Sequence, residues 1–175
     1  QMAKCALGHL MALGHRRVIF LARRITRERS NAFLAQKNAV ERAARVLDVE
    51  VLRRTVADSV VAGASLLTDR RLPRGCTAVV SNNPEALKGL LAAAWSHGVG
   101  VPDDFSVVSM GQAVPYSPDG RLATEVGVGR VRIGRRAGEL LLQRLAEPQA
   151  AVEHLMVRAS LADRGSAAAA GELSV

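Results

Sequence analysis

Four short polar segments, each following an apolar run, hold the side chains best suited to binding a small molecule. Charged, amide and hydroxyl groups come from Arg27, Arg29, Asp58, Ser59, Asn83 and Gln112. Arginine pairs with anions, and amides both donate and accept hydrogen bonds. The same residues have structural uses, because the arginines can be solvated loop charges and Asn83 can cap a turn. The sequence leaves both interpretations open.

Patterns typical of catalysis or metal binding do not appear in the sequence. No metal-ligand spacing such as HExxH joins the four histidines, His9, His15, His97 and His154. There is no GxSxG nucleophile motif, and Cys5 and Cys76 stand alone. The stretch from Gly127 resembles a dinucleotide loop, but Arg132 occupies its third glycine position. We therefore expect no enzymatic activity, no metal and no cofactor.

The elements that position the polar segments follow from hydrophobic spacing. Apolar positions at helical spacing, with Gly14 and Gly98 as closing residues and Pro84 in a first turn, indicate helices. We expect helices over residues 4–13, 32–47, 60–71, 84–97 and 131–145. Short apolar runs predict strands over residues 18–22, 49–56, 77–81, 105–110, 122–126 and 152–160.

This alternation predicts an α/β fold with a three-layer, doubly wound and mainly parallel sheet. The carboxyl ends of parallel strands share one edge, where such sheets bind ligands. The loops around residues 23–31, 57–59, 82–84 and 111–112 should therefore line a single pocket.

Length and composition favour one cytoplasmic domain of ordinary size. The 175 residues are 49% hydrophobic, enough for a substantial core. A net charge of +8 is compatible with nucleic acid, but 3% aromatic residues leave few stacking platforms. No apolar run approaches the roughly 18 residues of a membrane span, and no export signal is visible. The chain begins at Gln1, so we expect a tag remnant or a fragment of a longer protein.

Five motifs, in order along the chain, resemble the lactose-repressor (LacI/GalR-type) family of transcription regulators. They are His9-Leu-Met-Ala-Leu-Gly-His-Arg-Arg-Val18, Thr77-Ala-Val-Val-Ser-Asn-Asn83, Gly98-Val-Gly-Val-Pro-Asp-Asp-Phe-Ser-Val-Val108, Ala123-Thr-Glu-Val126 and Leu155-Met-Val-Arg-Ala-Ser160. Each motif alone is weak, but their shared order and near-family spacing are specific. The resemblance implies a two-lobed sensor of the periplasmic-binding-protein type, whose first lobe is incomplete here.

The resemblance also implies a domain organisation. Residues 3–22 and 123–147 would be remnants of the first lobe, and residues 23–121 and 152–162 would form the second lobe. Residues 163–175 are rich in Ala, Gly and Ser, and we expect a disordered tail there. The first and penultimate helices should expose apolar faces. Operator DNA would be contacted only through an N-terminal domain that this chain lacks.

The expected effector pocket departs from the family pattern. Phe33 stands where the family commonly has an arginine, and Pro84 replaces the acid that follows Asn83. The acid after the fourth strand is also missing, and Ser59 follows Asp58 where an aromatic residue is common. Two hypotheses remain. The sensor binds a less hydroxylated or anionic effector through Arg27 and Arg29, or the effector site has decayed.

The family's dimer interface involves the helix after the third strand and its neighbours. The resemblance therefore implies a homodimer with contacts from Val60, Val61, Glu85, Lys88, Ala92 and Trp95. Burial of Trp95 in the core is the alternative. The favoured function is the effector-sensing and dimerisation segment of a cytoplasmic transcriptional regulator, without a membrane partner. A solute-binding protein of a transporter and a truncated relic that only dimerises are the alternatives.

Overall fold

The computed structural model describes residues 1–24, 30–67, 69 and 71–170, except for the side chains of residues 30–33 and 74. The helices are α1 (Met2–Ala12), α2 (Ser30–Leu47), α3 (Val60–Ala64), α4 (Pro84–Ser96) and α5 (Arg130–Ala146), with a short 3-10 turn at Pro73–Gly75. The strands are β1 (Arg17–Arg23), β2 (Glu50–Val56), β3 (Ala78–Ser81), β4 (Ser106–Met110), β5 (Thr124–Gly127) and β6 (Ser160–Ala162).

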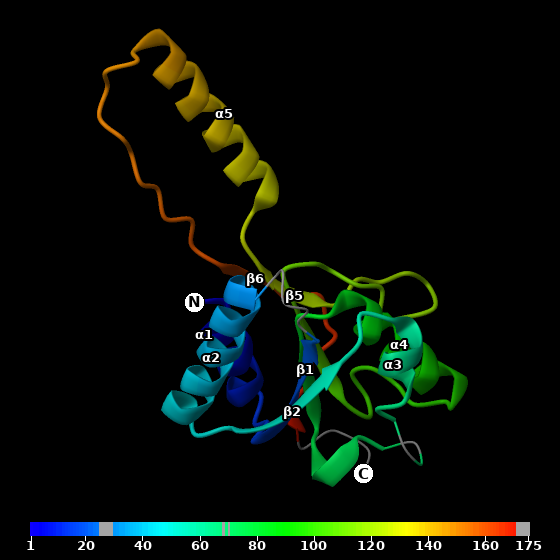
Figure 1. Cartoon of the computed structure of the whole chain (residues 1–175). Coiled ribbons are helices and arrows are strands. Elements are labelled where there is room, and N and C mark those ends of the chain that lie inside the picture. Colours follow the sequence, from blue (N-terminus) through cyan, green and yellow to red (C-terminus); the bar gives the residue numbers. More distant parts are fainter. Residues whose placement is uncertain (25–29, 68, 70, 171–175) are drawn as a thin grey trace.

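The six strands form one sheet in the order β2-β1-β3-β4-β5-β6. Neighbouring strands from β2 to β5 run parallel, and β6 runs antiparallel to β5. Helices α1 and α2 cover one face of the sheet, while α3 and α4 cover the other (Figure 1). The predicted three-layer α/β fold with a mainly parallel sheet is confirmed.

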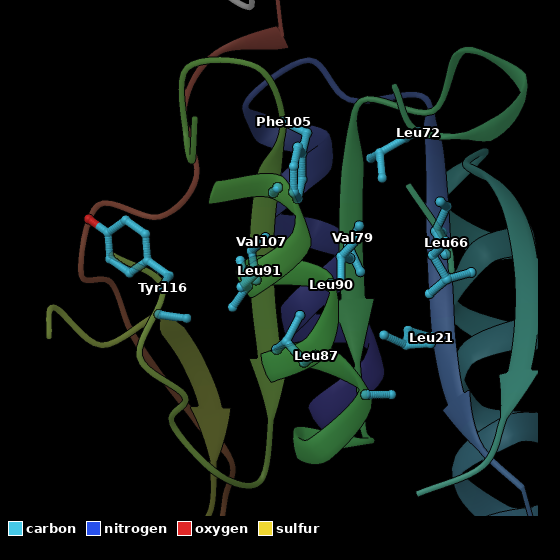
Figure 2. Packing of buried hydrophobic residues seen from close by; sticks show 14 of the residues in the cluster. Leu21, Leu66, Leu72, Val79, Leu87, Leu90, Leu91, Phe105, Val107 and Tyr116 are labelled. Atoms are coloured by element: carbon cyan, nitrogen blue, oxygen red, sulfur yellow. The ribbon is translucent and has the colours of Figure 1, made fainter. Parts of the chain in front are cut away.

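Each face of the sheet carries its own hydrophobic core, because successive side chains of a strand point to opposite faces. Strand β1 shows this division. Ile19 and Leu21 pack under α3 and α4, whereas Val18 and Phe20 pack under α1 and α2. Figure 2 shows the first of these two cores, in which Leu90 of α4 lies over the sheet. The sequence of a strand that is buried on both faces is therefore a continuous run of apolar residues.

The boundary expected between two lobes at residues 22 and 23 falls inside strand β1. Strand β1 continues through Arg23 and lies between β2 and β3 in the sheet. Helix α1 packs on α2 and on the same core as β1, so residues 3–22 belong with the following strands. Strand β5 also belongs to this sheet, and the chain leaves it only after Gly127. The apolar residues of β1 are buried on both faces of the sheet, because α1 and α2 cover one face and α3 and α4 cover the other.

Helix α5 projects away from the sheet (Figure 1). None of its residues is buried, and its exposed apolar side chains are Val131, Ile133, Leu141, Leu142 and Leu145. The prediction of exposed apolar faces named the first and penultimate helices, whereas the structure shows such a face on α5, the last helix of the described residues. The same prediction is wrong for α1, where Leu7 and Leu10 are buried against α2 and the sheet.

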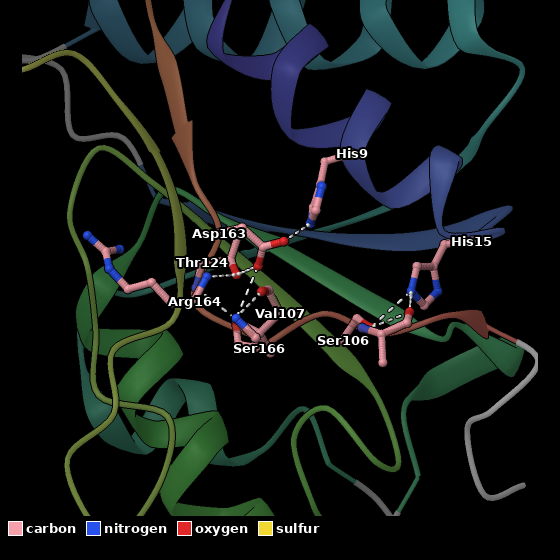
Figure 3. A network of polar contacts seen from close by, with 10 residues as sticks. His9, His15, Ser106, Val107, Thr124, Asp163, Arg164 and Ser166 are labelled. Atoms are coloured by element: carbon pink, nitrogen blue, oxygen red, sulfur yellow. Dashed lines mark hydrogen bonds and ion pairs between the residues drawn. The ribbon is translucent and has the colours of Figure 1, made fainter.

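The C-terminal segment differs from both predictions made for it. The strand expected over residues 152–160 is confined to Ser160–Ala162, because its pairing partner β5 is itself short. Residues 163–170 are packed rather than disordered. Ser166 is fully buried, and its hydroxyl donates to the Val107 carbonyl at 2.7 Å and accepts from the Thr124 amide at 2.7 Å (Figure 3). Residues 171–175 lie outside the described residues.

Candidate functional site

The ends of β1, β2 and β3 meet at the carboxyl edge of the sheet, and hydrogen bonds tie their loops together. The Arg23 amide donates to Asn82 Oδ1 at 3.1 Å, which links β1 to the loop after β3. Asn83 Nδ2 donates to the Ala57 carbonyl at 3.1 Å, which links that loop to the end of β2. Parallel pairing of β3 with β4 places Gln112 at the same edge. These loops thus lie together, as the parallel sheet predicts.

Asn83 is fully buried and is used by the fold itself. Its Oδ1 accepts from the Ala86 amide at 3.2 Å, so it caps the N-terminus of α4. Its Nδ2 is bound to Ala57. Both functional atoms of this side chain therefore have partners within the chain, and the capping use foreseen for Asn83 is the one that the structure shows.

Asp58 and Ser59 are also engaged by neighbours. The Asp58 carboxylate forms an ion pair with the Arg23 guanidinium at 3.2 Å, on the adjacent strand end. Ser59 Oγ accepts from the Ala62 amide at 3.3 Å and caps α3. Sequence reasoning did not single out Arg23, because its pairing with Asp58 depends on the order of β1 and β2 in the sheet.

An amide pair that the sequence did not reveal joins α2 to the sheet edge. Asn82 Nδ2 donates to Gln36 Oε1 at 2.8 Å. Gln36 lies close after Phe33, the α2 residue that was expected at the pocket. Only this position on the helix could have indicated from the sequence that Gln36 reaches the sheet edge. These two amides, with Arg23, are the polar groups that the sequence missed.

For the other predicted site residues, the structure gives few or no side-chain contacts. Arg27 and Arg29 lie outside the described residues, and Phe33 lies on α2 with a side chain that is not described. Gln112 has an exposed side chain, and its carbonyl accepts from Ser109 Oγ. The structure therefore brings Asp58, Ser59 and Asn83 to one edge together with Gln112.

A cavity of about 220 Å³ lies beside this edge, between α1, α2 and the end of β4. Its lining residues are Gln1, Met2, Ala3, Ala35, Gln36, Ala39 and Met110. The surface is mostly apolar, and Gln36 connects it to the hydrogen-bonded loops through Asn82. A mostly apolar cavity with a few polar groups is a candidate site for a small molecule.

The described residues hold no cluster of three or more His, Cys, Asp or Glu side chains that could bind a metal ion. Among the same residues, no helix is both long and apolar enough to cross a bilayer.

A second surface, on the opposite face of the sheet, contains the residues expected at a dimer interface. Helices α3 and α4 pack closely, and we call their outer side the α3/α4 surface; it comprises Val60, Val61, Glu85, Lys88, Ala92 and Trp95. Val61 and Trp95 are 81% and 54% exposed, and Glu85 pairs with Lys88 at 2.7 Å. The alternative that Trp95 lies in the core is wrong, since half of it faces solvent.

Comparison with known proteins identifies the domain family to which this chain is similar. Residues 7–167 match the periplasmic binding protein-like domain family. No curated protein shows significant similarity to the sequence. A LacI family transcriptional regulator from Bifidobacterium animalis has a similar structure, with a TM-score of 0.77 and 21% identity. The match covers 95% of this chain and 60% of that protein, so the chain spans about 60% of its length.

Two further solved structures agree with this match. A LacI-family regulatory protein from Corynebacterium glutamicum has a TM-score of 0.73 at 26% identity, covering 95% of this chain and 64% of its own. A LacI family regulator from Enterococcus faecium, solved with bound ribose, has a TM-score of 0.75 at 20% identity, covering 95% and 62%. These matches confirm the resemblance that the five motifs indicated.

Proposed function

Because the chain belongs to the periplasmic binding protein-like family, we propose that it is the effector-sensing part of a LacI-type transcriptional regulator. The observation that carries this proposal is the meeting of parallel strand ends at one edge, beside a cavity of about 220 Å³. Ligands of open α/β sheets bind at that edge. Similarity to LacI-family regulators over 95% of the chain supports regulation rather than catalysis as the use of the site.

Helix α5 supports a second lobe contributed by residues outside these 175. The chain leaves the sheet after β5, forms an amphipathic helix, and returns to the sheet at β6. Its apolar side chains Leu141, Leu142 and Leu145 are each more than 60% exposed. Contiguous exposed apolar surface of this kind normally contacts another surface. In the proposal that surface is the first lobe, and a small-molecule effector binds between the lobes. The family resemblance alone suggests a sugar or related metabolite for it.

Coupling to DNA follows from this arrangement. Two copies pair through the α3/α4 surface, and closure of the lobes on an effector changes the relative position of two DNA-reading segments that lie outside this chain. Binding affinity for the effector and for DNA would then be linked reciprocally. The protein would act in the cytoplasm without a membrane partner and without an enzymatic step.

The first test is DNA selection with the full-length gene product. We expect sequencing of bound fragments of its own genome to show enrichment of one near-palindromic sequence, because a symmetric dimer reads two half-sites. The 175-residue chain alone serves as the control and should enrich no sequence. A full-length product that selects no sequence would contradict the regulatory function.

A further inference from the structure

We propose that the effector is a compact, mainly apolar molecule with one hydrogen-bond acceptor, bound in the cavity between α1, α2 and the end of β4. This inference rests on the proposed function, because it names the ligand class of the same site. Three observations carry it: the pairing of the polar groups at the sheet edge, the chemistry and size of the cavity, and the orientation of Gln36.

Among the described residues of the sheet edge, Asp58, Ser59, Asn82 and Asn83 already have side-chain partners within the chain. Both functional atoms of Asn83 are bonded, and Asp58 is paired with Arg23 at 3.2 Å. Asn82 uses its Oδ1 and its Nδ2, and Ser59 caps α3. To bind these four residues, a polyhydroxylated ligand would have to displace their internal bonds, and the buried groups among them would lose a partner. These residues are therefore a poor match for a sugar.

The cavity beside the edge is apolar. Ala3 and Met110 are 5% and 7% exposed, and Met2, Ala35 and Ala39 complete the apolar lining. Methionine side chains are polarizable and adapt to the faces of rings. Such a lining favours a ligand by burial of its apolar surface rather than by hydrogen bonds.

The volume limits the size of the ligand. The cavity measures about 220 Å³. An apolar cavity of about 150 Å³ is enough to hold benzene. One six-membered ring with a substituent of two or three heavy atoms therefore fits in this volume.

Gln1 and Gln36 are the polar residues of the lining, and the hydrogen-bond network sets the orientation of Gln36. The Arg23 amide can only donate, so the Asn82 atom that faces it at 3.1 Å is Oδ1. Asn82 then presents Nδ2 to Gln36 at 2.8 Å, and the Gln36 atom that receives it is Oε1. The Nε2 amide of Gln36 has no hydrogen-bond partner among the described residues and lies on a side chain that lines the cavity. It can donate to a carbonyl or ether oxygen of the ligand.

The test uses acetophenone as the probe, with the full-length gene product. Ethylbenzene, which lacks the carbonyl oxygen, and ribose are compared by titration calorimetry. We expect acetophenone to bind at least tenfold more tightly than ribose. Gln36→Leu should weaken acetophenone about tenfold and change ethylbenzene less than twofold, because only the carbonyl loses a donor. A merely structural role of Gln36 would weaken both aromatic compounds equally.

A filling variant tests the location. Ala35 lines the cavity from an exposed position on α2, so Ala35→Phe adds a ring to the cavity without overpacking the core. We expect it to abolish acetophenone binding. The matched control is Asn38→Phe, which adds the same ring at an exposed position of the same helix outside the lining. Acetophenone binding that survives Ala35→Phe, or ribose binding more tightly than acetophenone, would overturn the proposal.

The result of the acetophenone-binding experiment can be distinguished from the result of DNA selection. If the protein selects an operator but no aromatic probe binds, the ligand class is wrong and the regulatory function stands. If acetophenone binds as expected but no DNA is selected, the cavity assignment stands and the regulatory function fails.

Discussion

His15 shows how one buried polar side chain holds distant segments together. Its ring is fully buried, and its nitrogens lie 2.8 Å from Thr77 Oγ1, 2.9 Å from Ser106 Oγ and 3.0 Å from the Ala168 carbonyl. The network joins the loop after α1, the amino ends of β3 and β4 and the C-terminal segment (Figure 3). Burial lowers the pKa of His15 below its usual value of 6.5, because the charged ring would be poorly solvated.

This shift predicts acid sensitivity of the fold. The unfolded chain binds a proton near pH 6.5 and the folded chain binds it only at lower pH, so stability is complete above pH 6.5 and falls below it. We expect the midpoint of thermal unfolding to fall between pH 7 and pH 5. His15→Gln should flatten this dependence while lowering stability at pH 7 by about 1–3 kcal/mol, through lost buried bonds.

His97→Gln serves as the comparison variant, because it removes a histidine that is exposed at the end of α4. Asp163 makes a separate contribution to stability at lower pH. Its bond from the Gly165 amide lowers the pKa of this carboxyl below 3.8, so the stability that it contributes is lost only as pH falls beneath that value. If the midpoint of thermal unfolding fell equally between pH 7 and pH 5 in the wild type and in His15→Gln, the role of His15 would be contradicted.

At the scale of the elements, two glycines allow α3 and α4 to touch backbone to backbone. A Cβ on Gly63 would lie 1.7 Å from the Ala86 carbonyl oxygen, and one on Gly89 would lie 1.8 Å from that of Val60. Backbone atoms cannot move aside without displacing a helix. We expect Gly89→Ala to destabilise the protein by about 3 kcal/mol, the upper end of typical overpacking costs, measured by denaturant unfolding.

Gly8 offers the matched control, since it lies inside α1 and a Cβ there would meet no atom within 4 Å. Gly8→Ala should stabilise the protein by up to about 1 kcal/mol, because alanine is the better helix former. If both substitutions had the same effect, close packing of α3 on α4 would not be what requires glycine at position 89.

At the scale of the whole molecule, the α3/α4 surface bears the proposed dimer. It combines exposed apolar side chains with an aromatic residue of the kind that often dominates interface energy. We expect Trp95→Ala to weaken dimerisation at least tenfold, as measured by sedimentation velocity of the full-length product. Val46→Ala, at a 73% exposed apolar position on α2, should leave dimerisation unchanged. A fully dimeric Trp95→Ala protein would place the interface elsewhere.

The sequence by itself determined the order and type of most elements. The continuous apolar run at residues 18–22 and the one at 105–110 predict buried strands, and β1 and β4 lie there. Pro84 and Gly98 bracket a helix that the structure confirms as α4. These signals are local, because side-chain periodicity and backbone preferences act over a few residues. The same signals placed Asp58 and Asn83 at the carboxyl edge of the sheet.

Only the tertiary structure decided which segments share a core and which polar groups pair. The Ala-rich tail conceals Ser166, whose buried contacts with Val107 and Thr124 join residues about 40 to 60 positions apart. The pairing of Arg23 with Asp58 and of Asn82 with Gln36 depends likewise on strand order. No local pattern encodes such partners, because their proximity results from packing the whole sheet. A ligand can bind only to the polar groups that these internal hydrogen bonds and ion pairs leave available.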